Sequence, residues 1–452
     1  MTVEAEGHLH LAADVPPPPP PPPPAKRLGR MMSLAMVVGT IVGSGIYVLP
    51  AQVAPFGANL VLAFVLTGAG TFLLALCMAR LAGALPGGPY SHVASAFGDR
   101  AAFIAMWSSM LSQVTGAAAT AIAVGGAIGV AVPALASPVS ITVIGLVTLL
   151  VLALVQSRGA RSAGRVQVTA ALIKLVPLVL VLLLVLLLVA RGGSVQPLAP
   201  VPLTLTATIA AAALMLFAFT GFEAGTISAN VTDNAQESVP SATIRGTAFV
   251  AMLYLAATLA VLWLLPSAIA AASPTPIADA IAPSFGPSAR TLVALVGAVS
   301  ALGTCNALIL LSVEVARALA NAGDLPASFA AIDSNGVSRR SLVAAVLLAM
   351  AMVAGSVSEN FLSAFNFVAL VSAVGALVLY LACAAVAWRL QVVGAAVAVP
   401  ALLYSVAMFW GSGGEAVLWA ALLAVAGLPI RWFSRRASAR AEQAAAPPEP
   451  VA

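Results

Sequence analysis

The chain has 452 residues, of which 61% are hydrophobic and only 8% are charged. Soluble globular domains carry about 25% charged residues, so this composition excludes an ordinary soluble protein and requires that much of the surface faces lipid. The formal net charge of +5 is compatible with a nucleic-acid partner, but the positions of the basic residues, given below, provide another explanation.

Residues 1–30 form a tail that contains an unbroken proline run from Pro16 to Pro24. A proline run favours an extended polyproline II rod without internal hydrogen bonds, and such rods also dock into aromatic grooves. Because no folded segment surrounds the run, we predict a disordered cytoplasmic spacer. The tail lacks the order of charge, apolar stretch and small-residue cleavage site that is typical of a signal peptide.

From Met31 onward, the chain consists of apolar segments of about 20 residues or more, the length that crosses a membrane. The runs are continuous rather than alternating, which predicts helices that satisfy their own backbone hydrogen bonds in lipid. We therefore predict an all-α, polytopic membrane bundle of about twelve transmembrane helices. The predicted spans are 31–55, 58–84, 101–131, 138–156, 165–190, 203–229, 245–271, 288–321, 341–357, 361–388, 391–412 and 415–432.

The basic residues indicate how this bundle is oriented. With both termini in the cytoplasm, every lysine and arginine lies on the cytoplasmic side except Lys174, within a span, and Arg191 and Arg290, outside. This asymmetry agrees with the positive-inside rule. It predicts a multi-pass protein of a bacterial-type inner membrane and explains the basic charge without nucleic acid.

The first predicted helix contains the tripeptide Gly43-Ser44-Gly45 in the middle of its apolar run. Two glycines weaken a helix at mid-span. An unwound turn there would expose backbone N–H groups and the positive end of a helix dipole, which suits a carboxylate ligand. The alternative is close helix packing through small residues.

The sixth predicted helix contains Phe217-Ala218-Phe219-Thr220-Gly221-Phe222-Glu223, again with a glycine at mid-span and here with a lone acid. A charged side chain at membrane depth costs about 2.5–3.5 kcal/mol on insertion scales, so Glu223 is expected to be protonated, paired or next to water. Glu223 is therefore a candidate proton carrier or gate. The alternative is a structural hydrogen bond to a neighbouring helix.

Lys174 lies in the fifth predicted helix, about 13 Å from its cytoplasmic end if nine residues rise by 1.5 Å each. A lysine at that depth is a candidate for proton exchange, because burial disfavours its charged form. The alternative is that the side chain snorkels to the cytoplasmic headgroups, which requires a long reach.

The two interrupted helices are the first and the sixth. Interruptions at corresponding places in two five-helix halves predict an inverted repeat with the substrate site between the halves. We therefore expect a ten-helix transport core over residues 31–390, two further helices over 391–432 and a cytoplasmic tail over 433–452.

Several motifs resemble those of the amino acid–polyamine–organocation (APC) permeases, and the resemblance covers residues 28–432. They are Gly43-Ser44-Gly45-Ile46 with Leu49-Pro50, Pro86-Gly87-Gly88-Pro89-Tyr90, Phe219-Thr220-Gly221-Phe222-Glu223, Asn234 with Pro240-Ser241-Ala242, and Gly323-Asp324-Leu325-Pro326. Within this superfamily, the chain resembles the basic amino acid/polyamine antiporters, in particular the arginine/agmatine antiporters. We expect Tyr90 and His92 to lie in a loop before the third helix.

The resemblance implies a LeuT-like fold of two inverted five-helix repeats with discontinuous helices 1 and 6. It also implies that backbone amides at Ser44 and Gly45 hold an α-carboxylate, while helix-six carbonyls near Phe217 and Thr220 receive the α-amino group. The substrate-binding residues implied are Ile41, Ser44, Gly45, Phe217, Thr220, Leu308 and Ser372. The residues implied for gating and proton coupling are Glu223, Lys174, Phe217 and Phe365.

Two departures from the arginine antiporters bear on the substrate. The polar and aromatic residues that grip the guanidinium in that family correspond to Ala117 and Leu308, which favours a neutral or apolar amino acid because a cation–π partner is missing. Lys174 matches a lysine of proton-coupled relatives, where its ammonium resembles a stand-in for sodium that bridges helices one, five and eight.

We therefore expect a secondary active amino acid transporter rather than an enzyme, sodium-independent and coupled to protons, without a metal or other cofactor. Its partners would be an amino acid, protons and the lipid bilayer; a homodimer is left open. The alternatives are an arginine/agmatine-type amino acid–polyamine exchanger and a membrane sensor that binds amino acids without moving them.

Overall fold

The computed structural model describes residues 34, 37–39, 41–85, 88–158, 163–223 and 235–445. Side chains are described from Ile173 after the gap at 159–162, from Pro240 after the gap at 224–234, and up to Ala437 at the C-terminal end. The described part is all-α. Its helices are α2 (Gly45–Val53), α3 (Asn59–Ala84), α4 (Pro89–Phe97), α5 (Asp99–Ala131), α6 (Pro138–Gln156), α7 (Ala163–Ala190), α8 (Leu205–Phe219), α10 (Ala235–Leu264), α11 (Ser267–Ala272), α12 (Pro276–Asn321), α13 (Arg339–Gly355), α14 (Phe361–Arg389), α15 (Ala395–Gly411) and α16 (Gly414–Ala445).

Within the described residues, eight helices are long and apolar enough to cross a membrane. Three shorter apolar helices accompany them, at Gly45–Phe56, Leu205–Phe219 and Ala395–Gly411. Two of these three belong to the first and sixth predicted spans, because both spans are interrupted where the glycines occur. The prediction of an all-α polytopic bundle is confirmed.

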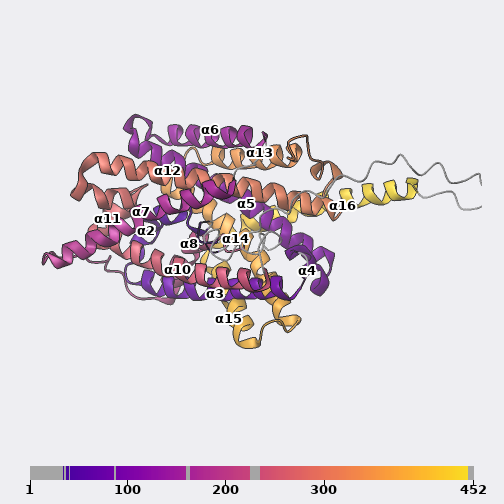
Figure 1. Ribbon diagram of the computed structural model, residues 1–452, viewed down its shortest axis with the longest axis horizontal. Coiled ribbons are helices and arrows are strands. Elements are labelled where there is room, and N and C mark those ends of the chain that lie inside the picture. The colour runs from indigo at the N-terminus through magenta and orange to yellow at the C-terminus, as the bar shows by residue number, and fades with distance from the viewer. Residues whose placement is uncertain are drawn as a thin grey trace, which may run out of the picture.

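Helices α5, α8 and α14 lie in the middle of the bundle and α6 lies along one edge (Figure 1). In the most apolar window of α5, 89% of the residues are buried, and in that of α14, 72%. The same fraction is only 22% in α6 and 17% in α16. The large exposed side chains of α6 are all valine or leucine, and those of α16 are leucine, valine, isoleucine and aromatic residues. An apolar face of this extent suits contact with lipid.

Small residues allow the central helices to pack closely. A Cβ atom added at Gly125 of α5 would lie 2.5 Å from the carbonyl oxygen of Ile141 in α6. One added at Gly375 of α14 would lie 3.0 Å from the carbonyl oxygen of Ser108 in α5. Such close approach is the usual source of van der Waals attraction between helices in lipid.

Two expected boundaries are wrong. Tyr90 and His92 lie in helix α4 rather than in a loop, because Pro89 occupies the first turn, where its missing N–H has no cost. The span predicted over 245–271 ends early, since α10 stops at Leu264 and Pro266 precedes the separate helix α11. The span predicted over 288–321 is the part of α12 that follows a kink at Gly286.

A buried carboxylate joins three segments at the end of the bundle where α12 ends and α16 emerges. Asp324 is 0% exposed and accepts hydrogen bonds from the Tyr90 hydroxyl at 2.6 Å and from the Nε atoms of Arg431 and Arg435 at 2.8 Å each. We call these four residues the Asp324 cluster. It ties α4 and the turn after α12 to α16, and the two guanidinium groups offset the charge of the buried carboxylate.

Candidate functional site

The first predicted helix is unwound at the predicted place. Residues 37–39 and Ile41 are helical, residues 42–44 are bends, and α2 begins again at Gly45. The Tyr254 hydroxyl donates to the carbonyl oxygen of Ile41 at 2.9 Å, which satisfies one acceptor that the interruption leaves. The interruption therefore presents the N-terminus of α2 inside the bundle.

The sixth predicted helix is also interrupted. Helix α8 ends at Phe219, and Thr220 has an extended ψ of 159°, with its hydroxyl donating to the Phe217 carbonyl oxygen at 2.7 Å. Gly221 has a φ of +109°, a conformation that side chains other than glycine rarely adopt. The residues from 224 to 234, where the second half of this helix and Asn234 were expected, lie outside the described residues.

The two interruptions are in direct contact. A Cβ atom added at Gly45 would lie 2.7 Å from both the Cα and the Cβ atom of Ala218, so the backbone at Gly45 packs directly on this small residue. This contact places the N-terminus of α2 beside the C-terminal turn of α8. The two termini carry opposite partial charges, because the helix dipole is positive at an N-terminus and negative at a C-terminus.

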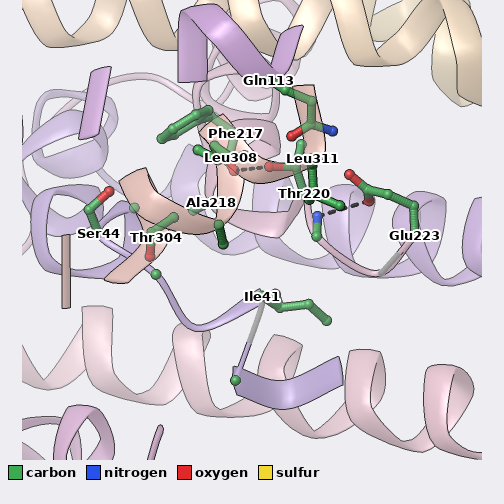
Figure 2. A pocket seen from close by; sticks show the side chains of 15 residues that line it. Ile41, Ser44, Gln113, Phe217, Ala218, Thr220, Glu223, Thr304, Leu308 and Leu311 are labelled. Atoms are coloured by element: carbon green, nitrogen blue, oxygen red, sulfur yellow. Dashed lines mark hydrogen bonds between the residues drawn. The ribbon is translucent and has the colours of Figure 1, made fainter. Parts of the chain in front are cut away.

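A pocket of about 40 Å³ lies between these termini and is closed on its other sides by α5 and α12 (Figure 2). In that view, Ser44 and Glu223 lie on opposite sides of the pocket, and Gln113 lies on the side of Glu223. The lining residues are Gly39, Ile41, Gly43, Ser44, Gly45, Gln113, Phe217, Ala218, Thr220, Gly221, Glu223, Thr304, Ala307, Leu308 and Leu311.

Ser44 is the residue before α2, and its hydroxyl is buried. The side chain is 1% exposed, and its Oγ atom has no hydrogen-bond partner among the described residues. An unsatisfied buried hydroxyl costs about 1–3 kcal/mol, so a ligand that bonds to Oγ recovers that energy. The Tyr47 N–H of the first turn of α2 donates to the Ser44 carbonyl oxygen at 3.0 Å, and the hydroxyl with the N–H groups that precede Tyr47 is a candidate site for a carboxylate.

Glu223 lines the opposite side of the pocket and is 7% exposed. Its Oε2 atom accepts a hydrogen bond from the Gly221 backbone N–H and another from the Tyr380 hydroxyl of α14, each at 2.9 Å. The ring of Phe222 packs against that of Tyr380, with centroids 4.7 Å apart. The acid is therefore linked to α14 through one tyrosine.

Lys174 lies behind the first interruption and does not reach the headgroups. Its side chain is 2% exposed, and Nζ is 3.5 Å from the carbonyl oxygen of Val42. Nζ is also the atom closest, at 3.6 Å, to a Cβ added at Gly303 of α12. The ammonium thus lies between α7, the first interruption and α12, and it forms no ion pair with any described residue.

The aromatic pair Phe217 and Phe365 lies next to the pocket, but only Phe217 lines it. The two rings meet edge to face with centroids 5.8 Å apart, and Phe365 is fully buried between Phe217 and Phe361. Ser372 also lies behind the residues that line the pocket. Its Oγ atom would be 3.1 Å from a Cβ atom added at Gly116 of α5, and its hydroxyl donates to the Ser112 carbonyl oxygen at 2.8 Å. Leu308 lines the pocket directly.

The sequence reasoning chose the wrong residue on α5. Ala117 does not line the pocket; its carbonyl oxygen accepts from the Cys305 thiol at 3.4 Å. Gln113, one turn earlier, lines the pocket instead, and its 6% exposed side chain forms no hydrogen bond with a described residue. In the sequence, Gln113 stands out as an amide among mostly small and apolar residues, but the sequence does not show which side of the helix faces the pocket. Thr304 and Leu311 were also missed.

Comparisons with known proteins agree with this architecture. A profile of the amino acid permease family matches residues 28–427. The chain is 26% identical to the cadaverine/lysine antiporter of Escherichia coli (strain K12), over 73% of this chain and 74% of that protein. It is 23% identical to the putrescine transporter PotE of the same strain, over 89% and 95%, and 23% identical to PotE of Haemophilus influenzae, over 90% and 97%.

The fold and these matches define a multi-pass membrane transporter of small molecules rather than an enzyme. The chain belongs to the amino acid permease family. The resemblance inferred from the motifs, to APC permeases of the basic amino acid/polyamine antiporter type, is confirmed.

Proposed function

We propose that this protein is a secondary active carrier of a neutral amino acid that works by alternating access around the pocket between the two interrupted helices. The observation that carries the proposal is the position of the unpartnered Ser44 hydroxyl and the α2 N-terminus opposite the C-terminal end of α8. A positive and a negative main-chain terminus, held a few ångströms apart, complement the two charges of an amino acid.

The α-carboxylate would accept hydrogen bonds from Ser44 Oγ and from the first backbone N–H groups of α2. The α-ammonium would lie near the last carbonyl oxygens of α8, which have no partners within the helix. The side chain would then extend between α5 and α12, toward Leu308 and Leu311. This arrangement uses the main chain for the part common to all amino acids and side chains for selectivity.

The pocket has to widen before it accepts a substrate. A volume of about 40 Å³ holds about three water molecules, less than the volume of an amino acid. The conformation described here is therefore a contracted one, and binding favours a wider one. A ligand shifts such an equilibrium only by its difference in affinity between the two states.

Lys174 and Glu223 are the residues that would couple this change to protons. The Lys174 ammonium lies against the first interruption, and Glu223 lies against the second. Loss of the proton from Lys174 would remove a positive charge next to the Val42 carbonyl oxygen and loosen the contact of α7 with the unwound segment. This role of the ammonium would make transport independent of sodium.

The central experiment measures uptake of labelled amino acids into proteoliposomes under an imposed pH gradient without sodium. Ser44→Ala should abolish uptake, whereas Ser405→Ala should not, because that buried hydroxyl bonds within its own helix to Ala401 at 2.9 Å. Lys174→Ala should also stop uptake while leaving folded protein. Binding without any flux would instead identify a sensor, and full uptake by Lys174→Ala would exclude the coupling role.

A second candidate function is exchange of a cationic amino acid for a diamine. It is favoured by Glu223, an acid that lines the pocket, and by the similarity to the cadaverine/lysine antiporter and to PotE. The neutral preference is favoured by the apolar side chains of Leu308, Leu311 and Phe217. Competition of leucine, alanine, lysine and cadaverine for uptake, combined with counterflow from preloaded vesicles, separates the two functions.

The proposal includes an inner-membrane location with both termini in the cytoplasm. This orientation follows from the arginine-rich ends of the helices and puts the Asp324 cluster on the cytoplasmic side. Reporter fusions at Ala445 and in the turn after α13 should report the cytoplasm and the outside, respectively. The reverse result would overturn the orientation without affecting the proposed substrate site.

A further inference from the structure

A second and larger cavity lies between α13, α14 and α16, apart from the pocket between the interrupted helices. Its volume is about 640 Å³, within the range of about 300–1,000 Å³ that is usual for small-molecule sites. None of its lining residues lines the first pocket. Its apolar wall is formed by Leu348, Met352, Phe367, Val368, Trp419 and Leu423.

The cavity has an acidic mouth. Glu359 lies between the end of α13 at Gly355 and the start of α14 at Phe361, and Glu415 lies in the first turn of α16. Both acids are exposed, both line the cavity, and neither forms an ion pair with a described residue. Leu423 is eight residues further along α16, about 12 Å deeper at 1.5 Å per residue.

The surroundings of this cavity are lipid-facing. Leu347 on α13 is 60% exposed, and Leu418 and Leu422 on α16 are 58% and 52% exposed. Each of these leucines is the sequence neighbour of a lining residue, Leu348, Trp419 or Leu423. The cavity therefore lies next to the apolar outer surface of α13 and α16. No basic side chain lines the described wall, which leaves the negative charge of the mouth without a partner.

We propose that this cavity binds a phospholipid of the phosphatidylethanolamine type. Its primary ammonium would bind at Glu359 and Glu415, and one acyl chain would follow the apolar wall past Trp419 toward Leu423. A bilayer supplies such a molecule at high concentration, and its head group provides the hydrogen-bond donors that two carboxylates require. Phosphatidylglycerol would meet the same mouth with a negative charge only, so the site selects the amine.

The bound lipid would pack against α14, the helix that carries the proposed gating residue Phe365. Phe367 and Val368 of α14 line the lipid cavity, while Phe365 of the same helix packs against Phe217 at the substrate pocket. Val371 likewise lines the cavity, next to Ser372, which packs toward Gly116. A chain in the cavity therefore packs against the back of α14. Transport activity would rise with this lipid, but binding itself does not depend on the proposed substrate.

The test uses Trp419 as a reporter in nanodiscs that contain phospholipids brominated on the acyl chain. Subtracting the signal of Trp419→Phe isolates quenching at this residue. Brominated phosphatidylethanolamine should quench Trp419 about two- to fivefold more effectively than brominated phosphatidylglycerol, as expected for one or two partly exposed ion pairs. Trp410 on α15, 61% exposed and outside the cavity, should be quenched equally by both lipids.

The matched variants are E359Q/E415Q, which should remove the preference, and E314Q, an exposed acid elsewhere on α12 that should leave it unchanged. All replace exposed carboxylates by amides of the same shape, so folding is expected to persist. Equal quenching by the two lipids in the wild type would show unselective filling and overturn the proposal. A preference that persists in E359Q/E415Q would overturn the role of the acids.

Discussion

Asp324 and Glu223 are two buried carboxylates in one chain with different partners. Asp324 is 0% exposed and bonds to Tyr90 and to the guanidinium groups of Arg431 and Arg435. Glu223 is 7% exposed, lines the substrate pocket, and accepts from the Tyr380 hydroxyl and a backbone N–H. The first carboxylate joins segments at one end of the bundle, and the second lies where the chain is unwound.

The difference between them lies in what protonation would cost. A proton on Asp324 would leave two guanidinium groups facing a neutral acid, so its charge is part of the structure. A proton on Glu223 would leave both described hydrogen bonds possible, because a protonated carboxyl group still has an oxygen that accepts them. We therefore expect the acid paired with arginines to serve as a fixed link, and the proposed coupling role belongs to Glu223, which accepts from the Tyr380 hydroxyl and the Gly221 N–H.

The largest effect is expected for Asp324→Asn. The amide leaves Arg431 without a counter-charge among the described residues and leaves Arg435 only the exposed pair with Asp99 at 3.3 Å. Breaking a buried pair typically costs about 3–5 kcal/mol, and Arg435, the more exposed partner, contributes less. We expect a lower melting temperature and a lower yield from membranes. Arg317→Gln, which breaks the exposed pair with Glu314, is the control and should change little. A melting temperature of Asp324→Asn equal to that of the wild type would show that the Asp324 carboxylate is not a structural link and would remove its contrast with Glu223.

Glu223→Gln should affect transport rather than stability. The amide oxygen can accept both bonds that Oε2 now accepts, so the melting temperature should stay close to that of the wild type. Uptake driven by a pH gradient should fall about 5- to 150-fold, the usual range for a coupling free energy of about 1–3 kcal/mol. Counterflow at equal pH is the matched measurement and should fall less. A lower melting temperature with an unchanged pH dependence of uptake would show that Glu223 is a structural residue and not a coupling residue.

Gln113→Leu should change selectivity by a smaller amount. Gln113 has no hydrogen-bond partner among the described residues and lies on the same side of the pocket as Glu223, so it is available to a polar group at the end of a substrate side chain. Loss of one hydrogen bond, about 0.5–1.5 kcal/mol, shifts the ratio of serine to leucine uptake by about two- to tenfold. Ala117→Ser, one turn away and outside the pocket, should leave the ratio unchanged. An unchanged ratio in Gln113→Leu would show that the side chain does not contact the substrate.

The smallest effect is expected for Tyr90→Phe, which removes one bond of the Asp324 cluster, worth about 1 kcal/mol. Burial and the hydrogen bond to Asp324 raise the pKa of Tyr90 to about 12, from an ordinary value of 10.0. A raised pKa means that the contribution is complete below pH about 10 and is lost as the pH rises through about 12. Melting curves between pH 7 and 12 should therefore show an alkaline loss that Tyr90→Phe reduces. A loss centred at neutral pH would contradict this.

The interruptions could be predicted because their cause is local. Glycines at positions 43, 45 and 221, within long apolar runs, identify both unwound turns without knowledge of any neighbour. The resemblance to APC permeases implied Ile41, Ser44, Phe217, Leu308 and Glu223 as site residues, and all five line one pocket. Lys174 was expected inside a span, and its 2% exposure excludes snorkelling.

The parts that could not be predicted depend on how helices are rotated against each other. Successive residues of a helix differ by about 100° in direction, so choosing between Gln113 and Ala117 requires knowing where the pocket lies. The Asp324 cluster joins residues 107 and 111 positions apart, a pairing that one sequence does not reveal. Helix α4 was missed because the glycines and prolines before it indicated a loop.

The contact between Gly45 and Ala218 sets a geometric limit on the transport cycle. Since a single added methyl group at Gly45 would come within 2.7 Å of the neighbouring Cα, the two unwound segments have no clearance in this conformation. They cannot approach further, so any rearrangement that admits cargo has to slide or separate them. The Cα hydrogen atoms of Gly45, together with the Cα atom and methyl group of Ala218, thus set how closely the two interruptions approach in this conformation.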